Sequence, residues 1–188
     1  MTNTQRAASS RRNPVQSPLR VTAFDTELGW LAIAFRNELV ARVAFGHRTP
    51  REAVQGLDML DEAEIVQRLT PAEQAIAARL QAFAKGAADD LRDIPLDTRR
   101  LTKFALRVVE QCRRIPPGET LSYAELADKA GSPAAARAVG NVMRSNRFPL
   151  IVPCHRVVGA GRSIGGYSAA DGLEMKRRLL ALEGVYLD

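Results

Sequence analysis

The sequence is poor in the residues that bind metals or form disulfides. It contains two cysteines, Cys112 and Cys154, and two histidines among 188 residues. Two cysteines cannot build the disulfide framework of a small secreted protein, and these four residues lack the spacing of a zinc site. We therefore expect no structural metal and a reducing, cytoplasmic setting.

Long apolar runs are also missing. No segment approaches the roughly 20 apolar residues that a membrane-spanning helix needs, so we expect no membrane partner. Arg11 and Arg12 are not followed by an apolar segment, which argues against an export signal. Residues 1–20 contain no acidic side chain and few apolar ones, and this composition predicts a disordered basic tail.

The net charge of +6 is unevenly distributed along the chain. Residues 51–97 carry 5 basic and 10 acidic side chains, whereas residues 98–188 carry 15 basic and 8 acidic ones. A basic segment is the electrostatic signature of a polyanion partner, although a basic surface can also serve solubility alone. The change of sign predicts a domain boundary near residue 97.

Residues 21–97 are predicted to form an N-terminal α/β domain, a small antiparallel sheet with helices. Residues 30–35 and 39–45 are apolar runs of β-favouring residues, and the turn between them predicts a hairpin. An earlier strand is expected at 21–24. A weak helix is expected at 50–60.

Two capping boxes mark helix starts. Thr70 and Ser122 each stand three residues before a glutamate, Glu73 and Glu125, so each pair can satisfy the free N–H groups of a first turn. Gly86 ends the first of these helices. Asp171 is expected to cap a last helix in the same manner as the threonine and serine.

Residues 98–188 are predicted to form a mostly α-helical C-terminal domain. A helix at 101–113 places Cys112 on its apolar face, so we interpret Cys112 as a core residue. Two short helices follow, one opening at Ser122 and one running from Ser132-Pro133 to Ser145, and a tight glycine turn joins them. Such a pair predicts a helix-turn-helix.

The second helix of this pair is unusually slim. Residues 134–140 are alanine, valine and glycine except for one long cation, Arg137. A core helix with a solvent-exposed arginine is one interpretation. Because the helix lies in a basic domain and can approach another surface closely, contact with nucleic acid is the interpretation we favour.

The stretch from Pro149 to Val158 carries the strongest chemical signal. A short apolar run lies between Pro149 and Pro153. Cys154 follows the second proline, and a histidine and an arginine come next. Proline restricts its own φ and the residue before it, so we expect Cys154 at the end of a rigid, strand-like segment. A thiol beside an imidazole is a candidate nucleophile, and a buried structural cysteine is the alternative. A glycine-rich loop at 159–168 can bring backbone close to a ligand.

Several of these motifs, in this order, resemble the methylated-DNA–protein-cysteine methyltransferases, also called O6-alkylguanine-DNA alkyltransferases. The resemblance covers about residues 100–184, and residues 21–97 are similar to the family's N-terminal α/β domain with weaker signatures. Some members hold zinc in that domain, but this chain lacks the necessary cysteines and histidines. The matching motifs are Ser122-Tyr123, Ala135-Ala136-Arg137-Ala138-Val139-Gly140, Asn146, Pro153-Cys154-His155-Arg156-Val157-Val158, Gly166-Tyr167-Ser168 and Leu180-Ala181-Leu182-Glu183-Gly184.

The resemblance implies direct reversal of DNA damage without a cofactor. The protein would bind double-stranded DNA, flip an O6-alkylguanine or an O4-alkylthymine out of the stack, and move the alkyl group irreversibly to Cys154. Each molecule would react once. It would be a monomer in solution, able to cluster on DNA.

The resemblance also implies roles for residues of the reaction. His155 would activate Cys154 through a water molecule, and Glu183 would orient His155 and favour its charged form. Tyr123 would donate its hydroxyl to the leaving guanine, and Asn146 would brace the turn that presents the thiol.

The remaining implied roles concern binding. Arg137 would fill the gap that the flipped nucleotide leaves in the base stack. The base pocket would be formed by Tyr123, Met143, Val157, Ile164, Tyr167 and Ser168. The DNA surface would comprise Ser122, Ala135, Ala136, Arg137, Ala138 and Arg144.

Three other interpretations compete with this one. Alkyltransferase-like proteins bind lesions without repairing them, but they lack the acceptor cysteine that this chain has. A transcriptional regulator would leave the glycine-rich loop and the Cys-His pair unexplained. A cysteine hydrolase would need an oxyanion hole and a separate histidine and asparagine pair, for which the sequence carries no signature.

Overall fold

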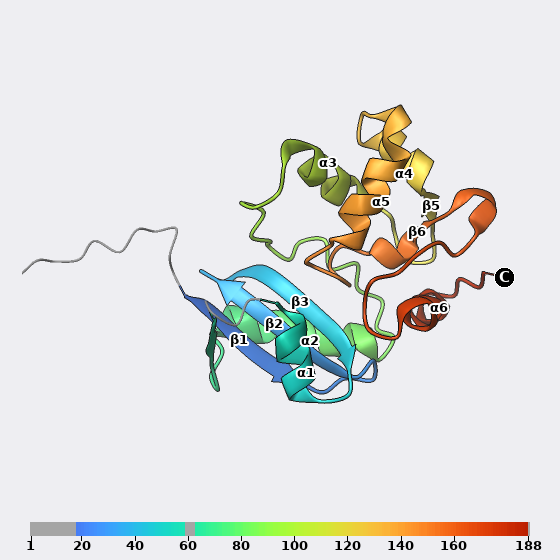
Figure 1. Ribbon diagram of the computed structural model, residues 1–188. Helices are drawn as coiled ribbons and strands as arrows, with labels where there is room; N and C mark the ends of the chain where they lie inside the picture. The colour runs from blue at the N-terminus through green and yellow to red at the C-terminus, as the bar shows by residue number, and fades with distance from the viewer. Residues whose placement is uncertain (1–17, 59–62, 188) are drawn as a thin grey trace, which may run out of the picture.

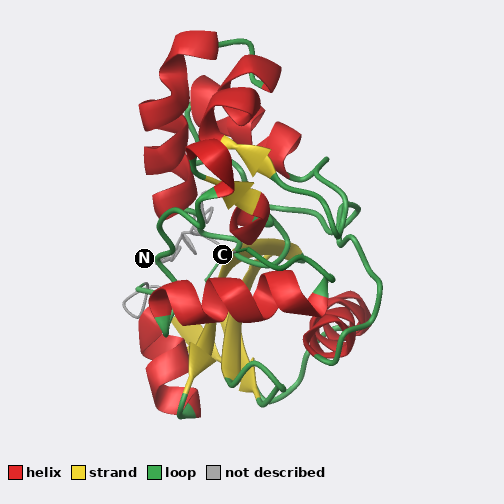
Figure 2. Ribbon diagram, turned by 90° about the vertical axis from the view of Figure 1, so that its right-hand side faces the viewer, coloured by secondary structure: helices red, strands yellow, loops and turns green. Residues whose placement is uncertain are grey.

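The computed structural model describes residues 18–58 and 63–187 (Figure 1). A β-sheet with helices forms the N-terminal part, and a cluster of helices packs against it as the C-terminal part (Figure 1, Figure 2). Most of the predicted basic tail, residues 1–17, lies outside the described residues. The prediction of a tail through residue 20 is wrong at its end, because β1 (Leu19–Phe24) already includes the last two of these residues.

The sheet has four strands in the order β3-β2-β1-β4. β2 (Trp30–Arg36) pairs antiparallel with β1 and with β3 (Leu39–His47), as predicted. Asn37 and Glu38 join β2 to β3 with φ of 51° and 64°, the left-handed conformation of a tight hairpin turn.

The prediction of a purely antiparallel sheet is wrong, because β4 (Ala63–Ile65) pairs parallel with β1 and the sheet is therefore mixed. The chain passes through α1 (Pro50–Gly56) before it reaches β4, and a helical crossover can return a strand in the parallel sense. α1 is shorter than the predicted helix at 50–60, of which residues 59 and 60 lie outside the described part.

Helices cover the two faces of the sheet. Alternate residues of β2 point to opposite faces, so Leu31, Ile33 and Phe35 belong to one hydrophobic cluster and Ala32 and Ala34 to another. α2 (Pro71–Ala84) packs on the first face, and α1 packs on the alanine face. Both faces of the sheet are therefore buried.

The C-terminal part is mostly helical, as predicted. Cys112 is fully buried, which agrees with its interpretation as a core residue. Both predicted capping boxes are present. The helices are α3 (Lys103–Cys112), α4 (Tyr123–Lys129), α5 (Ala136–Arg144) and α6 (Gly172–Leu182), and the parallel two-residue strands are β5 (Leu121–Ser122) and β6 (Val157–Val158).

Two helices begin differently from the prediction. A 3-10 helix, Pro133–Ala135, precedes α5, and Ser132 makes no side-chain capping bond. Asp171 at the start of α6 makes none either, and its φ is 62°. A capping side chain needs an extended backbone to reach the first free N–H groups, and neither residue has one.

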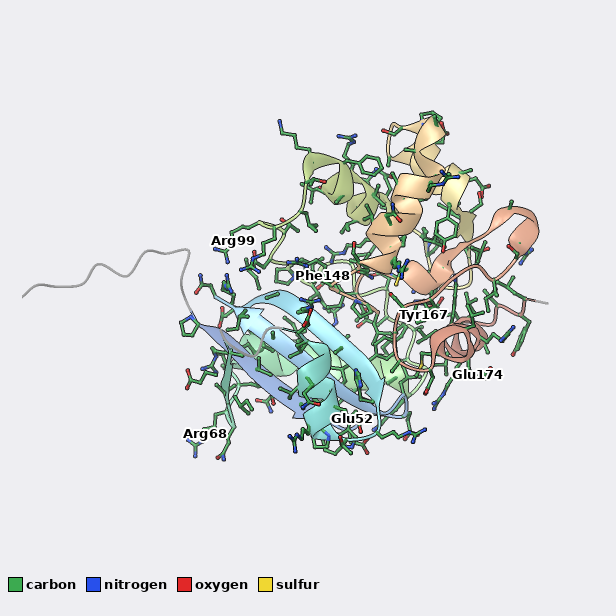
Figure 3. The ribbon with its side chains drawn as sticks, viewed as in Figure 1. Glu52, Arg68, Arg99, Phe148, Tyr167 and Glu174 are labelled. Atoms are coloured by element: carbon green, nitrogen blue, oxygen red, sulfur yellow. The ribbon has the colours of Figure 1, made fainter. Side chains whose placement is uncertain are left out.

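The sheet and the helical cluster share a core. One hydrophobic cluster includes Phe45 from β3 and Leu179 from α6, and Phe148 is buried between the two parts (Figure 3). The backbone N–H of Val43 donates to the carbonyl oxygen of Arg147 at 2.8 Å. The segment after α5 is thus fastened to β3. Within the described ranges, no helix is long and apolar enough to cross a membrane.

Candidate active site

Cys154 begins a short 3-10 helix, Cys154–Arg156, which leads directly into β6. The prediction of a strand-like segment before it is wrong, because residues 148–153 form turns and Leu150 has a φ of 73°. The two prolines of this segment have no N–H to offer a neighbouring strand, which favours a compact turn.

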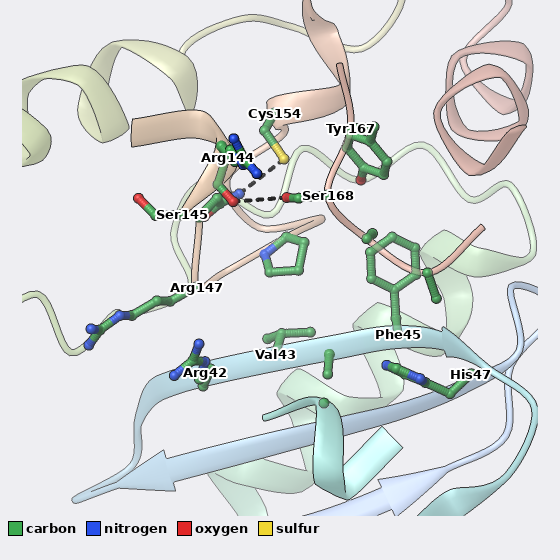
Figure 4. Close-up of a pocket in the computed structure, with 16 residues that line it drawn as sticks. Arg42, Val43, Phe45, His47, Arg144, Ser145, Arg147, Cys154, Tyr167 and Ser168 are labelled. Carbon is green, nitrogen blue, oxygen red and sulfur yellow. Dashed lines mark hydrogen bonds between the residues drawn. The ribbon is translucent and has the colours of Figure 1, made fainter. Parts of the chain in front are cut away.

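The side chain of Asn146 ties this turn to the thiol. Its amide nitrogen donates to the carbonyl oxygen of Val152 at 2.9 Å and to Sγ of Cys154 at 3.2 Å. Its amide oxygen accepts from the N–H of Phe148 at 3.0 Å. Figure 4 shows the bond to the sulfur. One amide therefore fixes both the turn and the position of Sγ.

Burial opposes ionisation of the Cys154 thiol, whereas several neighbouring groups favour it. The residue is 6% exposed, and burial raises the pKa of its thiol. The Asn146 amide, the charge of Lys176 and the Tyr167 hydroxyl act in the opposite direction. The Tyr167 hydroxyl lowers the pKa of the Cys154 thiol although it makes no hydrogen bond of ordinary geometry with the described residues. The neutral thiol is the resting form, and one positive charge and two neutral side chains beside it favour the thiolate.

Lys176 is a buried cation that the sequence reasoning missed. Its Nζ donates to the carbonyl oxygen of Val157 at 2.6 Å and, more weakly, to that of Gly166 at 3.4 Å. Burial lowers its pKa from 10.5 to about 8, while the thiol of Cys154 raises it. Lys176 thereby links β6 to the glycine-rich loop and places a positive charge behind the sulfur.

His155, Arg156 and Glu183 form a buried network. Nε2 of His155 lies 3.1 Å from Oε1 of Glu183, and Nη2 of Arg156 donates to the same oxygen at 2.7 Å. The resemblance implied the first contact, but the role of Arg156 was missed. Burial would raise the pKa of Glu183, yet His155 and Arg156 lower it to about 2.

Glu183 raises the pKa of His155, in the expected direction, but the net pKa of the buried ring is still lowered. His155 is 0% exposed, and burial, which is the largest influence on its pKa, lowers it. Arg156 and Lys176 lower it further. A neutral imidazole is the form that can accept a proton. Nδ1 of His155 is buried without a hydrogen-bond partner among the described residues.

A cavity of about 560 Å³ opens beside the thiol. Of the six residues expected in a base pocket, four line it, while Val157 and Ile164 lie outside its lining. Val157 is buried in β6 and contributes its carbonyl oxygen to Lys176 instead. The lining residues are Tyr123, Gly140, Met143, Arg144, Cys154, Gly166, Tyr167 and Ser168.

Tyr123 stands at the edge of this cavity on the first turn of α4. Burial and the nearby Cys154 raise the pKa of its hydroxyl, and a backbone hydrogen bond from Gly166 lowers it. A Cβ added to Gly165 would come within 3.3 Å of the tyrosine oxygen, and Gly165 also has a φ of 67°. Glycine at that position leaves Tyr123 the space it occupies.

Apart from its arginines, α5 presents mostly small side chains on its outer surface. Val139 and Met143 point into the core, while Arg137 and Arg144 are exposed. Of the other residues expected on a DNA surface, Ala138 is exposed, Ala135 and Ala136 are half-buried, and Ser122 caps α4 through its hydroxyl. The carbonyl oxygen of Arg144 accepts a hydrogen bond from Ser168 Oγ at 2.9 Å.

A buried thiol that an amide positions, beside a histidine–glutamate pair and a cavity, defines a protein with a cysteine nucleophile. No cluster of three potential metal ligands occurs in the part of the chain that the structure describes. A family model for the 6-O-methylguanine DNA methyltransferase, DNA binding domain, matches residues 103–185. A constitutive methylated-DNA–protein-cysteine methyltransferase of Bacillus subtilis is 34% identical, over 87% of this chain and 94% of its own. The chain belongs to the family of methylated-DNA–protein-cysteine methyltransferases.

Other relatives agree with this assignment. A relative of the same name from Mycobacterium tuberculosis is 46% identical over 105 residues, which are 56% of this chain and 61% of that protein. The chain thus spans less than two thirds of this mycobacterial relative in that alignment. The crystal structure of Mycobacterium tuberculosis OGT in complex with DNA has a TM-score of 0.70 and 32% identity, over 88% of this chain and 93% of the other.

Proposed function

We propose that this protein removes an alkyl group from O6-alkylguanine in double-stranded DNA and keeps it on Cys154. The observation that carries the proposal is the thiol itself, which Asn146 holds at 3.2 Å beside a cavity of about 560 Å³. Membership of the family supports the substrate class. The same pocket would also accept O4-alkylthymine, whose base is smaller than guanine.

The reaction is a displacement at the alkyl carbon. The proton of Cys154 passes to neutral His155 through a bridging water, and Glu183 holds the ring in place. The thiolate then attacks the alkyl carbon, a carbon–sulfur bond forms, and the carbon–O6 bond breaks. The electron pair of that bond goes to O6 of guanine, to which the hydroxyl of Tyr123 gives a proton. The proton that His155 took from Cys154 then restores the Tyr123 hydroxyl through water. The thioether has no route back, so each molecule reacts once and needs no cofactor.

Delivery of the base requires the helical part. We assign α4 and α5 to a helix-turn-helix within a C-terminal domain that begins near residue 98, after an N-terminal domain at 21–97. The slim face of α5 suits a narrow groove, and Arg137 would hold the gap in the stack while the base enters the cavity. Contacts to phosphates make binding strong at low salt and nearly independent of sequence. This role places the protein in the cytoplasm, on nucleoid DNA.

One experiment tests the proposal. The protein is mixed with a duplex that contains a single O6-methylguanine, and the masses of the intact protein and of its peptides are measured. We expect one added methyl group on the peptide that holds Cys154, and restored guanine in the DNA. Cys154→Ser should bind the same duplex and gain no mass. Binding without transfer by the unaltered protein would instead favour the non-repairing, lesion-binding class.

A further inference from the structure

A second cavity is also lined by Cys154. It measures about 420 Å³ and runs between β3 and the segment that follows α5. Three arginines line it, Arg42 from β3 and Arg144 and Arg147 from the C-terminal part. Figure 4 shows the side chains of Arg42 and Arg147 at the same end of the cavity. The proposed alkyl transfer uses neither of these two cations.

The two guanidinium groups repel each other. The pKa of Arg42 is lowered first by burial and then by the charges of Arg147 and Arg100, while Asp58 offsets part of this effect. Neither Arg42 nor Arg147 makes a side-chain hydrogen bond or ion pair with the residues that the structure describes (Figure 4). Both side chains are half-buried, so solvent screens their repulsion only in part.

Five other arginines of the described residues are paired with carboxylates. Arg42 and Arg147 differ from these five, because neither makes an ion pair with a carboxylate of the described residues. The neutralised pairs include Arg20 with Glu73, Arg79 with Asp89, Arg92 with Asp90, Arg99 with Asp97 and Arg156 with Glu183. Cations that are brought together without an ion-paired carboxylate form a site for an anion, and Asp58 only partly offsets their charge.

The backbone holds this cluster in place. The carbonyl oxygen of Arg147 accepts from the N–H of Val43 at 2.8 Å, so the residue after Arg42 is fastened to the residue that carries the second charge. Asn146 is fixed to Val152 and Cys154 on the other side. The positions of the two charges are therefore set before any anion arrives, which lowers the cost of binding one.

We propose that Arg42 and Arg147 form a second phosphate-binding surface, which contacts the backbone of the duplex that α5 engages. Arg147 lies three residues beyond Arg144 at the end of α5, so the cations continue from that helix onto β3. A duplex is a linear array of phosphates and can span both sets of cations. This inference rests on the proposed function, and it extends the DNA-binding surface onto the N-terminal sheet.

The test is the salt dependence of binding to an undamaged duplex, measured by fluorescence anisotropy. The variants are Arg42→Gln, Arg147→Gln and both together. Each lost phosphate contact should reduce the slope of log K against log salt by about 1, and the double variant by about 2. Lysine at both positions should restore most of the slope, because lysine also binds phosphate as a point charge. Thermal unfolding of each variant shows whether the fold is kept.

The matched control is the double variant Arg51→Gln and Lys85→Gln, which removes two exposed cations from α1 and the end of α2. A folded double glutamine variant of Arg42 and Arg147 with the same slope as this control would overturn the inference. Equal binding by the double lysine variant and the double glutamine variant would also overturn it. Methyl transfer by the unaltered protein is measured separately. A failure of the proposed function is therefore distinguishable from a failure of this surface.

Discussion

Arg156 binds both carboxylate oxygens of Glu183 with two donors on one edge of its guanidinium group. Nη2 donates to Oε1 at 2.7 Å and Nε donates to Oε2 at 3.0 Å, while Nη1 donates to the carbonyl oxygen of Ile115 at 2.6 Å. The two side chains are 1% and 5% exposed. The arginine that follows the Cys-His pair thus sets the orientation of the carboxylate on which His155 depends.

Replacement of Arg156 should therefore disturb His155 without changing the affinity for DNA. Arg156→Lys keeps the charge but loses the bidentate contact with Glu183, so we expect slower methyl transfer at nearly unchanged DNA affinity. Arg156→Met removes the charge that lowers the pKa of His155, and that pKa should rise. Single-turnover rates and NMR titration of the His155 ring measure the two effects. An unchanged transfer rate in Arg156→Lys would show that the bidentate contact has no part in the reaction.

Glu183 should make the fold sensitive to acid. Its folded pKa of about 2 lies below the ordinary 4.5, so it stabilises the fold above pH 4.5 and this contribution is lost as pH falls toward 2. The lost contribution is about 3 kcal/mol, from about 1.4 kcal/mol per pKa unit. Glu183→Gln leaves Arg156 buried without its partner and should cost about 3–5 kcal/mol at pH 7. Urea unfolding should show the gap to the unaltered protein closing between pH 4.5 and pH 2, and a constant gap would contradict the assignment.

Gly165 should matter more than its neighbour Gly166. A Cβ at Gly165 would lie 3.3 Å from the hydroxyl oxygen of Tyr123, and the φ of 67° disfavours any side chain, whereas a Cβ at Gly166 meets nothing within 4 Å. Gly165→Ala should displace Tyr123 and slow methyl transfer, and Gly166→Ala serves as the control. Equal rates for the two variants would mean that the position of Tyr123 does not limit the reaction.

Arg137 should act only when the base must leave a stack. Arg137→Ala should slow repair in duplex DNA by about ten- to a hundredfold, because unstacking costs a few kcal/mol. The effect on free O6-benzylguanine should be much smaller, since that substrate needs no flipping. Lys85→Ala, at the residue that follows α2, controls for the loss of one exposed cation. The same loss of rate on both substrates would contradict the role of Arg137 in the stack.

Features that depend on neighbouring residues could be predicted from the sequence. The capping boxes at Thr70 and Ser122 and the hairpin turn at Asn37 each need only a few adjacent residues, and the structure contains all three. β4 could not be predicted, because three residues carry no periodic signal and their pairing with β1 depends on the course of the whole chain.

The buried cations were the main gap in the predicted site. Arg156 and Lys176 are normally surface residue types, and their partners lie 27 and 19 residues away along the chain. A signal for Lys176 was present, because it stands three and four residues before Leu179 and Leu180 on the apolar side of α6. Arg156 stands directly before two buried valines, which also indicates burial.

Lys176 should control the ionisation of the thiol. Lys176→Met removes the positive charge that lowers the pKa of Cys154, so alkylation of Cys154 by iodoacetamide should shift to higher pH. Arg177→Met, which removes an exposed cation from the next position of α6, should leave that profile unchanged.

A second measurement tests the charge of Lys176 itself. Because its folded pKa is about 8, the unfolded chain binds more protons between pH 8 and the ordinary 10.5, and the fold gains stability as pH rises through that range. The free energy of unfolding of the unaltered protein, relative to Lys176→Met, should rise by about 3 kcal/mol there. A flat difference, together with an unshifted alkylation profile, would show that Lys176 only joins Val157 to Gly166 and does not act on the sulfur.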